Sequence, residues 1–269
     1  MTEAPEPLTG GNVAAGVVRV GDTVRRPAGP QTPAIHALLV YLHDVGYRRA
    51  PRSLGLDDAG RHVVEYVPGR VAHPTGRDNP PLDPVVVGRM VRGLHDALDG
   101  WEPPPDATWA CPIPTDGDDL VVHNDLAPWN IVVAADRLVL IDWDGASPGT
   151  RTWDLAYLAH GLVPLEPATA SDDVVARLRG LADGYRLDDG GRHRLATTLA
   201  PRTWSMHTLL RQGHATGEQP WARLWDEGHG DVWRRDARWV EAHADELRAA
   251  LVGRAPERMG RWASSPPTG

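Results

Sequence analysis

The chain reads His123-Asn124-Asp125-Leu126-Ala127-Pro128-Trp129-Asn130, and Asp142 follows twelve residues later within Ile141-Asp142-Trp143-Asp144. Apolar runs at residues 120–122, 131–133 and 138–141 bracket these two stretches and predict short strands. Strands on either side of a tight turn would bring a histidine, two carboxylates and an amide close together.

These side chains suit phosphoryl transfer from a nucleoside triphosphate to a hydroxyl. The hydroxyl proton needs a carboxylate acceptor, and magnesium prefers oxygen ligands. Rigid positioning and electrostatics do most of the catalytic work in such reactions. The spacing His-x-Asp-x4-Asn, followed by a second Asp, is that of a kinase catalytic loop with its metal-binding Asp. Asp125 is therefore the candidate base, and Asn130 and Asp142 are the candidate metal ligands.

Length and composition allow one large domain or two lobes, because 41% of the 269 residues are apolar. No apolar run approaches the ~20 residues that span a bilayer. Residues 1–8 are acidic and proline-bearing and lack a secretory signal pattern, so we expect a cytoplasmic protein. Cys111 is the only cysteine, which excludes an internal disulfide or a cysteine metal cluster.

The charge pattern argues against nucleic acid as a partner, since the net charge is −8 and no basic block occurs. We expect no membrane partner either, and a monomer or weak dimer. All 28 basic side chains are arginine. Residues 1–150 carry 20 acidic residues against 12 arginines, whereas residues 151–269 are balanced at 16 of each.

The pattern of elements predicts an α+β chain with two lobes. Residues 1–68 read as a small β-rich lobe that also holds a helix at about 33–44, with Thr32 as its N-cap. Residues 70–269 read as a larger, mostly helical lobe. Its expected helices lie at about 84–98, 154–161, 172–185, 192–212, where Pro201 would interrupt or kink the helix, and 221–251.

The motif residues resemble the aminoglycoside phosphotransferase family of kinase-like enzymes. The resemblance rests on the two quoted stretches, on Asp154-Leu155-Ala156 downstream and on Leu94-His95 upstream. It is strong over residues 120–160 and weak over about 8–251. It implies a bilobal protein-kinase-like fold with a hinge near 65–69, a magnesium ion, ATP or GTP as phosphoryl donor, and a small-molecule hydroxyl acceptor.

The resemblance also implies roles for residues around the motif. Asp125 would be the catalytic base, and Asn130 and Asp142 would ligate magnesium. His123 would steady the loop. Two further roles follow: Asp154 would brace the loop from the helical lobe, and Asp144 would approach either metal or substrate.

The N-terminal lobe departs from the family pattern because the chain has no lysine to pair the α- and β-phosphates. Arg25 is the expected substitute, although it also reads as a solvated strand residue. His36 stands where the family has the glutamate partner, and a packed core histidine is the competing interpretation. The other expected nucleotide contacts are Gly10 and Gly11, which also fit an ordinary turn, and Glu65 and Val67 at the hinge.

The sequence leaves the acceptor open among an aminoglycoside-like antibiotic, a sugar, an amino alcohol and other natural products. A polycationic acceptor would need carboxylates to converge in the helical lobe, and Asp226, Glu227 and Asp231 are candidates. The tryptophans at helical spacing in 221–239 fit core packing better than substrate stacking. The alternative function is a catalytically weak, kinase-like nucleotide-binding protein with a regulatory role.

Overall fold

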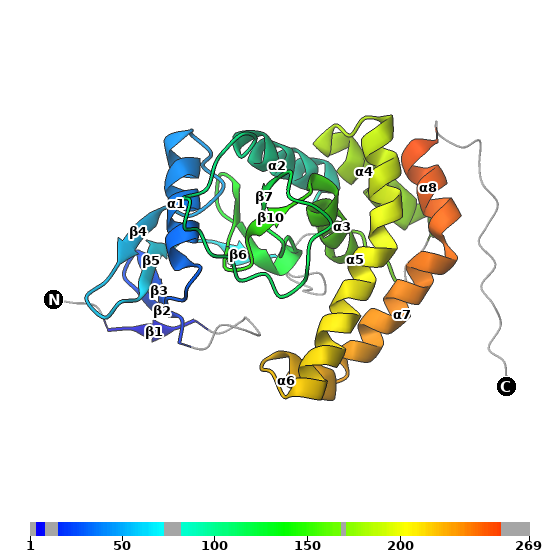
Figure 1. Cartoon of the computed structure of the whole chain (residues 1–269). Coiled ribbons are helices and arrows are strands. Elements are labelled where there is room, and N and C mark those ends of the chain that lie inside the picture. Colours follow the sequence, from blue (N-terminus) through cyan, green and yellow to red (C-terminus); the bar gives the residue numbers. More distant parts are fainter. Residues whose placement is uncertain (1–3, 9–15, 73–81, 168–170, 254–269) are drawn as a thin grey trace.

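The computed structural model describes residues 4–8, 16–72, 82–167 and 171–253. An N-terminal sheet with one helix lies at one end of the molecule and a set of long helices at the other (Figure 1). Short strands and the loops that carry the motif lie between them. The fold is therefore mixed α and β with a helical C-terminal part, as the sequence predicts.

The N-terminal sheet has five strands in the order β1-β2-β3-β5-β4, all antiparallel to their neighbours. The strands are β1 (Glu6–Pro7), β2 (Val18–Val20), β3 (Thr23–Arg26), β4 (Ser53–Leu56) and β5 (His62–Glu65). The sequence did not predict β4. The register of β3 against β5 places Arg26 opposite His62, which brings both side chains to one part of the sheet.

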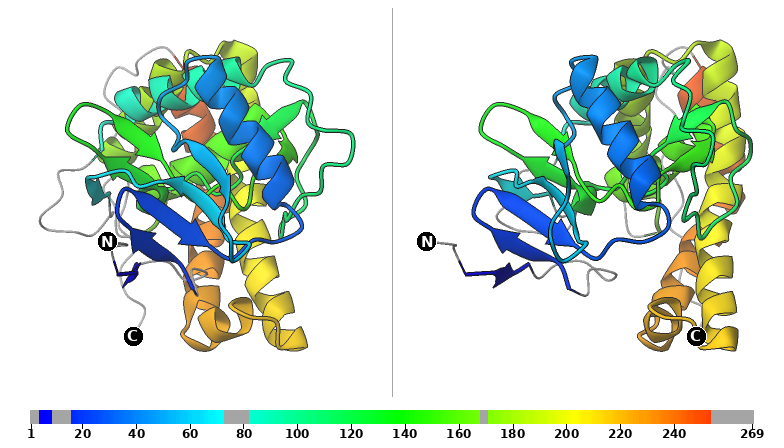
Figure 2. Two further views of the ribbon diagram at one scale, coloured as in Figure 1. Left: turned by 90° about the vertical axis from the view of Figure 1, so that its left-hand side faces the viewer. Right: turned by 60° about the vertical axis from the view of Figure 1, so that its left-hand side comes forward.

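Helix α1 (Thr32–Asp44) packs beside this sheet, as Figures 1 and 2 show. It buries a face made of Ile35, Leu38, Leu39 and Leu42. The predicted N-cap is wrong by one position, because Gln31 precedes the first helical residue. The Thr32 hydroxyl instead accepts a hydrogen bond from the Gly29 amide at 2.9 Å.

Two small sheets hold the motif in the middle of the molecule. One pairs β7 (Leu120–Val122) with β10 (Ser147–Gly149), and the other has the order β6-β8-β9. The strands of the second sheet are β6 (Arg70–Val71), β8 (Ile131–Val133) and β9 (Leu138–Leu140). A short 3-10 turn, Pro128–Asn130, leads directly into β8. The three strands predicted around the motif are confirmed.

The helical part comprises α2 (Pro84–Ala97), α3 (Arg151–Leu162), α4 (Ser171–Tyr185), α5 (Asp189–Thr216), α6 (Trp221–Asp226), α7 (His229–Ala242) and α8 (Ala244–Val252). The α2 N-cap is Asp83, whose carboxylate accepts from the Val85 amide at 2.8 Å. Helix α5 continues past Pro201, so the proline does not end it. The single helix expected at 221–251 is three helices, because Gly228 adopts φ 88° and breaks the first from the second.

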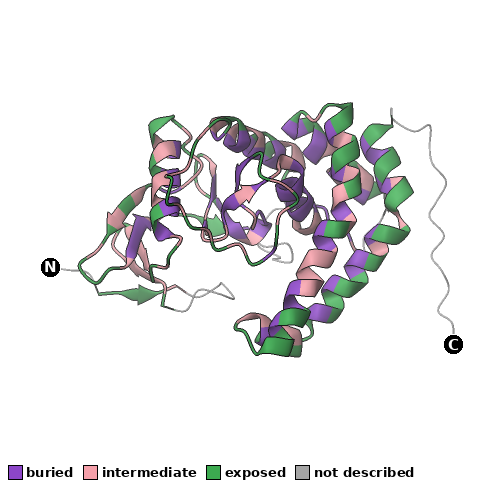
Figure 3. Cartoon of the chain, viewed as in Figure 1, coloured by how far each residue is buried: buried purple, intermediate pink, exposed green. Residues whose placement is uncertain are grey.

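Buried residues gather in the central strands and the helices around them (Figure 3). One cluster joins α1, α2 and the motif strands to α3, α4 and α5, and it includes the fully buried Trp143. None of the helices in the described residues is long and apolar enough to span a membrane. The expected contacts at Gly10 and Gly11 lie outside the described residues.

Candidate active site

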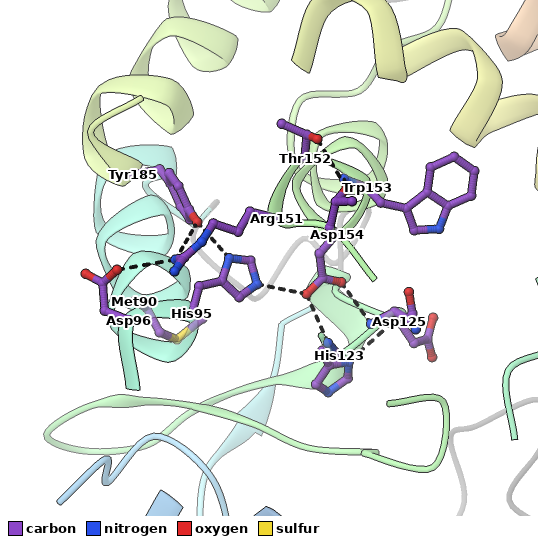
Figure 4. Close-up of polar contacts among 12 residues, drawn as sticks. Met90, His95, Asp96, His123, Asp125, Arg151, Thr152, Trp153, Asp154 and Tyr185 are labelled. Carbon is purple, nitrogen blue, oxygen red and sulfur yellow. Dashed lines mark hydrogen bonds and ion pairs between the residues drawn. The ribbon is translucent and has the colours of Figure 1, made fainter. Parts of the chain in front are cut away.

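The motif loop follows β7 and begins at His123, and residues of the helical part hold its backbone. Asn124 has φ 62°, a left-handed conformation that Asn tolerates better than most residues. The Asp154 carboxylate accepts hydrogen bonds from the backbone amides of His123 at 3.0 Å and Asn124 at 2.9 Å (Figure 4). Asp154 is fully buried on α3. The carboxylate therefore replaces the missing backbone partners of a strained turn.

A hydrogen-bonded chain holds Asp154 in turn. His95 on α2 donates from Nε2 to Asp154 at 3.1 Å, and its Nδ1 accepts from the Tyr185 hydroxyl at 2.8 Å. Arg151 donates to the same tyrosine oxygen at 3.4 Å (Figure 4). His95 therefore connects Tyr185 to Asp154 through its two ring nitrogens. The Leu94-His95 signal in the sequence thus corresponds to a support for the loop.

His123 links the two motif stretches across the loop. Its Nδ1 accepts from the Asp125 amide at 3.3 Å, so its Nε2 carries the proton and donates to the Ile141 carbonyl at 3.1 Å. The ring packs on Trp143, with centroids 4.6 Å apart. The segment that carries Asp125 is therefore tied to the segment that carries Asp142.

The Asp125 side chain lies at the centre of the site with Asn130 beside it. Asn130 donates from Nδ2 to the Asp125 carbonyl at 2.9 Å and to the Asp125 carboxylate at 2.7 Å. Burial raises the pKa of the Asp125 carboxyl above its ordinary value, His123 opposes the rise, and the neighbouring Asp142 adds to it. Hydrogen bonds from Asn130 and Tyr157 favour the ionised form.

Asp142 and Asp144 face one arginine from the N-terminal sheet. Arg26 on β3 contacts the Asp142 carboxylate at 2.7 Å and the Asp144 carboxylate at 2.6 Å. Burial acts to lower the pKa of Arg26, but Asp144 and Asp142 together outweigh it and raise that pKa. Burial raises the pKa of Asp144, with Arg26 opposing. Asp142 itself has φ 63°, so the backbone is left-handed here as it is at Asn124.

Arg25 does not reach these carboxylates. Its guanidinium pairs with Asp57 at 3.4 Å, and the same carboxylate pairs with Arg61 at 2.8 Å. Neighbouring residues of a strand point to opposite faces, so Arg25 and Arg26 cannot share a site. Of the two arginines, the structure brings Arg26 to the motif.

His36 belongs to a polar chain beneath Arg26. Its Nδ1 lies 2.7 Å from the Ser53 hydroxyl, which lies 2.7 Å from Nε2 of His62. Burial, and after it the charges of Arg26 and His36, lower the pKa of His62 to about 4. A chain of two histidines and a serine hydroxyl therefore stands where the sequence comparison expects a glutamate.

The hinge residues expected to meet the nucleotide lie at the end of β5. Glu65 accepts a hydrogen bond on its carboxylate from the Arg52 amide at 3.2 Å. The Tyr66 amide donates to the Asp22 carbonyl at 2.9 Å. Val67 follows, and among the described residues nothing hydrogen-bonds to its backbone.

The oxygen donors at the motif fit a magnesium ion. Both amide hydrogens of Asn130 are engaged by Asp125, which turns the Asn130 oxygen away from the base. The Asp142 carboxylate already attracts one cation, Arg26. Within the described residues, His, Cys, Asp and Glu do not form a group of three that holds a metal without help. An ion here would use the amide, the carboxylate and phosphate oxygens.

Sequence reasoning missed three contributors. The first is Arg26, because the sequence does not distinguish it from Arg25 and the prediction named Arg25. Arg202 on α5 donates to the Asn124 carbonyl at 3.0 Å, and nothing in its sequence surroundings points to the loop. Tyr157 on α3 interacts with the Asp125 carboxyl; it directly follows the Asp154-Leu155-Ala156 signal, which could have drawn attention to it.

Comparisons with known proteins identify the family of the chain. The model of the phosphotransferase enzyme family matches residues 101–196. The trifolitoxin immunity protein of Rhizobium leguminosarum bv. trifolii is 30% identical over 264 residues, covering 91% of this chain and 98% of that protein. The chain belongs to the phosphotransferase enzyme family. It is a kinase-like small-molecule phosphotransferase, which confirms the family resemblance seen in the motif.

Solved kinase structures share the fold. A choline/ethanolamine kinase family protein from Mesorhizobium loti is 18% identical with a TM-score of 0.57, covering 93% of this chain and 92% of that one. The microcompartment-associated aminopropanol kinase is 14% identical with a TM-score of 0.59, covering 87% and 90%. An amicoumacin kinase in complex with AMP-PNP and Ca2+ is 14% identical with a TM-score of 0.58, covering 86% of each chain.

Proposed function

We propose that this phosphotransferase moves the γ-phosphoryl group of ATP or GTP to a hydroxyl of a small molecule, with Asp125 as the base. The observation that carries the proposal is the coupling of Asp125, Asn130 and Asp142. The first two share hydrogen bonds, and His123 ties their loop to the segment that carries the third. Each of the three matches one requirement of the reaction.

The transfer proceeds in line. Asp125 accepts the proton of the acceptor hydroxyl as its oxygen bonds to the γ-phosphorus, and the bond from that phosphorus to the β–γ bridging oxygen breaks. The nucleoside diphosphate leaves with the bridging oxygen. Asn130 fixes the direction of the Asp125 carboxylate through its Nδ2. Partial burial raises the pKa of this carboxylate, so its proton affinity suits a transient acceptor.

Asn130 and Asp142 would hold the magnesium ion, which neutralises charge on the nucleotide phosphates. Arg26 would contribute the phosphate contact that the family assigns to a lysine. A guanidinium binds phosphate oxygens in a bidentate manner, and Arg26 is delivered to Asp142 by β3. Asp144 holds the other side of the same guanidinium, which supports a positioning role for this carboxylate.

The acceptor is better described as a molecule without several ammonium groups. The three carboxylates that could have formed an acidic site in the helical lobe each have a basic partner. Asp226 pairs with His214 at 3.0 Å, Glu227 with Arg223 at 2.9 Å, and Asp231 with Arg234 at 2.7 Å. Tyr157 interacts with the Asp125 carboxyl instead, and Trp129 packs edge to face on Tyr157.

A panel of hydroxyl acceptors with γ-labelled nucleotide tests the reaction. We expect Asp125→Asn to lower turnover by about 10²- to 10⁴-fold, because general-base catalysis contributes that much. The matched control is Asp136→Asn, an exposed carboxylate that pairs with the neighbouring Arg137. It should retain full turnover. Unchanged turnover in Asp125→Asn would refute the assignment of the base.

The 30% identity to an immunity protein over nearly its whole length favours a more specific candidate function. The chain would protect its host from a toxic compound by phosphorylating a hydroxyl. Expression in a sensitive strain tests this, with the wild-type chain and Asp125→Asn compared at equal protein levels. Protection by both proteins would favour the regulatory, catalytically weak alternative over the enzyme.

A further inference from the structure

Arg202 is a buried arginine for which the described residues provide no ion-pair partner. It lies on α5 with 2% of its surface exposed. No described carboxylate lies within 4 Å of its guanidinium, since the described ion pairs do not include it. Burying an unpaired charge is costly unless hydrogen bonds and ring contacts compensate. The contacts that Arg202 makes should therefore explain why it is buried.

The contacts of Arg202 converge on the catalytic loop. One terminal nitrogen, Nη2, donates to the Asn124 carbonyl at 3.0 Å, and Nη1 donates to the Ser205 hydroxyl at 3.0 Å. Its guanidinium carbon lies 4.1 Å from the ring centroid of Tyr157 and 5.2 Å from that of Trp153. Its Nε is buried without a partner. The site therefore does not satisfy the arginine fully, so its own hydrogen bonding does not explain its presence.

Asn124 directly precedes the proposed base, and both its backbone amide and its carbonyl form hydrogen bonds. Asp154 accepts from its amide, and Arg202 donates to its carbonyl. Its side chain donates to the Ser147 hydroxyl at 2.6 Å. Asp154 fixes the peptide group between His123 and Asn124, and Arg202 fixes the peptide group between Asn124 and Asp125. The second peptide group continues directly into Asp125, so its orientation sets where the carboxylate points.

Tyr157 supplies a second connection between Arg202 and the base. Its ring lies under the guanidinium, and it also packs on Trp233 with centroids 6.1 Å apart. Its hydroxyl interacts with the Asp125 carboxyl. Arg202 thus contacts both the backbone before the base and the tyrosine beside its carboxylate.

We propose that Arg202 is a positioning residue that, through the Asn124 carbonyl and the Tyr157 ring, aims the Asp125 carboxylate at the attacking hydroxyl. This inference rests on the proposed role of Asp125 as the base. A cation on α5 thereby joins the last long helices of the chain to the chemistry, 78 residues away from the loop in sequence.

The variants Arg202→Met, Arg202→Lys and Tyr157→Phe test the proposal. Magnesium-dependent hydrolysis of the nucleotide is the readout, because water then takes the place of the unidentified acceptor. A misdirected base costs rate, not nucleotide affinity, so we expect Arg202→Met to lower kcat about 10- to 100-fold with KM within about two-fold. We expect Arg202→Lys to recover part of the rate, since it keeps one charge and one donor. Tyr157→Phe should show a smaller loss.

Arg192→Met is the matched control. Arg192 also lies on α5 and donates to the carbonyls of Leu187 at 3.1 Å and Leu251 at 3.2 Å, but it does not contact the loop. We expect this variant to lose thermal stability and keep its kcat. Hydrogen exchange of the peptide spanning 123–126 gives a second readout, with faster exchange in Arg202→Met and unchanged exchange in Arg192→Met.

Turnover of Asp125→Asn, measured in parallel, distinguishes failure of the proposed base from failure of the proposed role of Arg202. Turnover that survives Asp125→Asn would overturn the proposed base and this inference together. Turnover lost in Asp125→Asn but normal in Arg202→Met, with normal exchange at 123–126, would overturn only the role of Arg202. A kcat that falls only in proportion to the folded fraction would have the same meaning.

Discussion

At the scale of single residues, side-chain direction decides which groups take part. Arg25 and Arg26 are adjacent and chemically identical, yet one pairs with Asp57 and the other with Asp142 and Asp144. From the sequence, Arg25 is the expected substitute for the missing lysine. Only the pairing of β3 in the sheet determines which face each occupies.

The two arginines should respond differently to truncation. We expect Arg26→Ala to lower kcat/KM for the nucleotide about 10- to 100-fold, because charge-assisted hydrogen bonds contribute roughly 1.5–3 kcal/mol. Arg25→Ala should change it by less than about three-fold. Steady-state kinetics with varied nucleotide checks both. Equal losses in the two variants would contradict the assignment to Arg26.

His62 gives the protein an acid-sensitive element. Burial and the adjacent Arg26 hold its pKa at about 4 in the folded chain, below the ordinary value of 6.5. The unfolded chain therefore binds the proton first, so stability is complete above about pH 6.5 and falls as the pH drops toward 4. The full loss amounts to roughly 3 kcal/mol. Urea unfolding of the wild type and His62→Gln between pH 4 and 7 checks this, with a shallower pH slope in the variant.

At the scale of elements, the close packing of α2 on α4 depends on glycine. A Cβ on Gly88 would lie 2.5 Å from the Leu181 carbonyl oxygen and 2.8 Å from the Tyr185 nitrogen. Gly184 faces the backbone of Val85 in the same way. The same two helices carry His95 and Tyr185, which support Asp154. The distance between α2 and α4 therefore affects how Asp154 is held against the motif loop.

Two glycines of α2 provide a matched comparison. We expect Gly88→Ala to destabilise the fold by about 1–3 kcal/mol through overpacking against backbone atoms that cannot move alone. Gly93→Ala should stabilise it by up to about 1 kcal/mol, because its Cβ would meet only the Tyr47 ring, at 3.8 Å, and alanine favours the helix. Thermal and urea unfolding measure both. Equal effects would contradict the close packing.

At the scale of the whole molecule, ion pairs connect the N-terminal sheet to the motif loops. Arg26 comes from the sheet, and Asp142 lies 116 residues further along the chain. Magnesium and nucleotide phosphates would engage these same groups. Binding there should join the two parts of the molecule more firmly.

Magnesium with nucleotide should therefore raise the melting temperature more than nucleotide in EDTA. Linkage gives about 2.7 kcal/mol of added stability at a hundred times Kd. We expect Asp142→Asn and Asn130→Ala to lose the magnesium-dependent part, and Asp136→Asn to keep it. Calorimetric melting of the four proteins measures the difference, and an unaltered magnesium response in both site variants would refute their role as ligands.

The sequence by itself determined the chemistry and much of the local structure. Asp125, Asn130 and Asp142 stand on short strands and turns close together in the chain, so local spacing is enough to bring them together. The strands around them and the helix capped by Asp83 follow for the same reason. Local signals did not reveal β4, the break at Gly228 or the N-cap of α1, because those boundaries depend on packing and backbone conformation.

Only the tertiary structure decided which distant groups serve the loop. Arg26, Arg202 and the chain from His95 to Tyr185 come from elements far apart in sequence. Their partners depend on strand register and helix packing, and a shift of one residue in a strand turns a side chain to the opposite face. The class of reaction is thus indicated by local spacing, whereas the groups that contact the motif loop from other elements come together only in the folded chain.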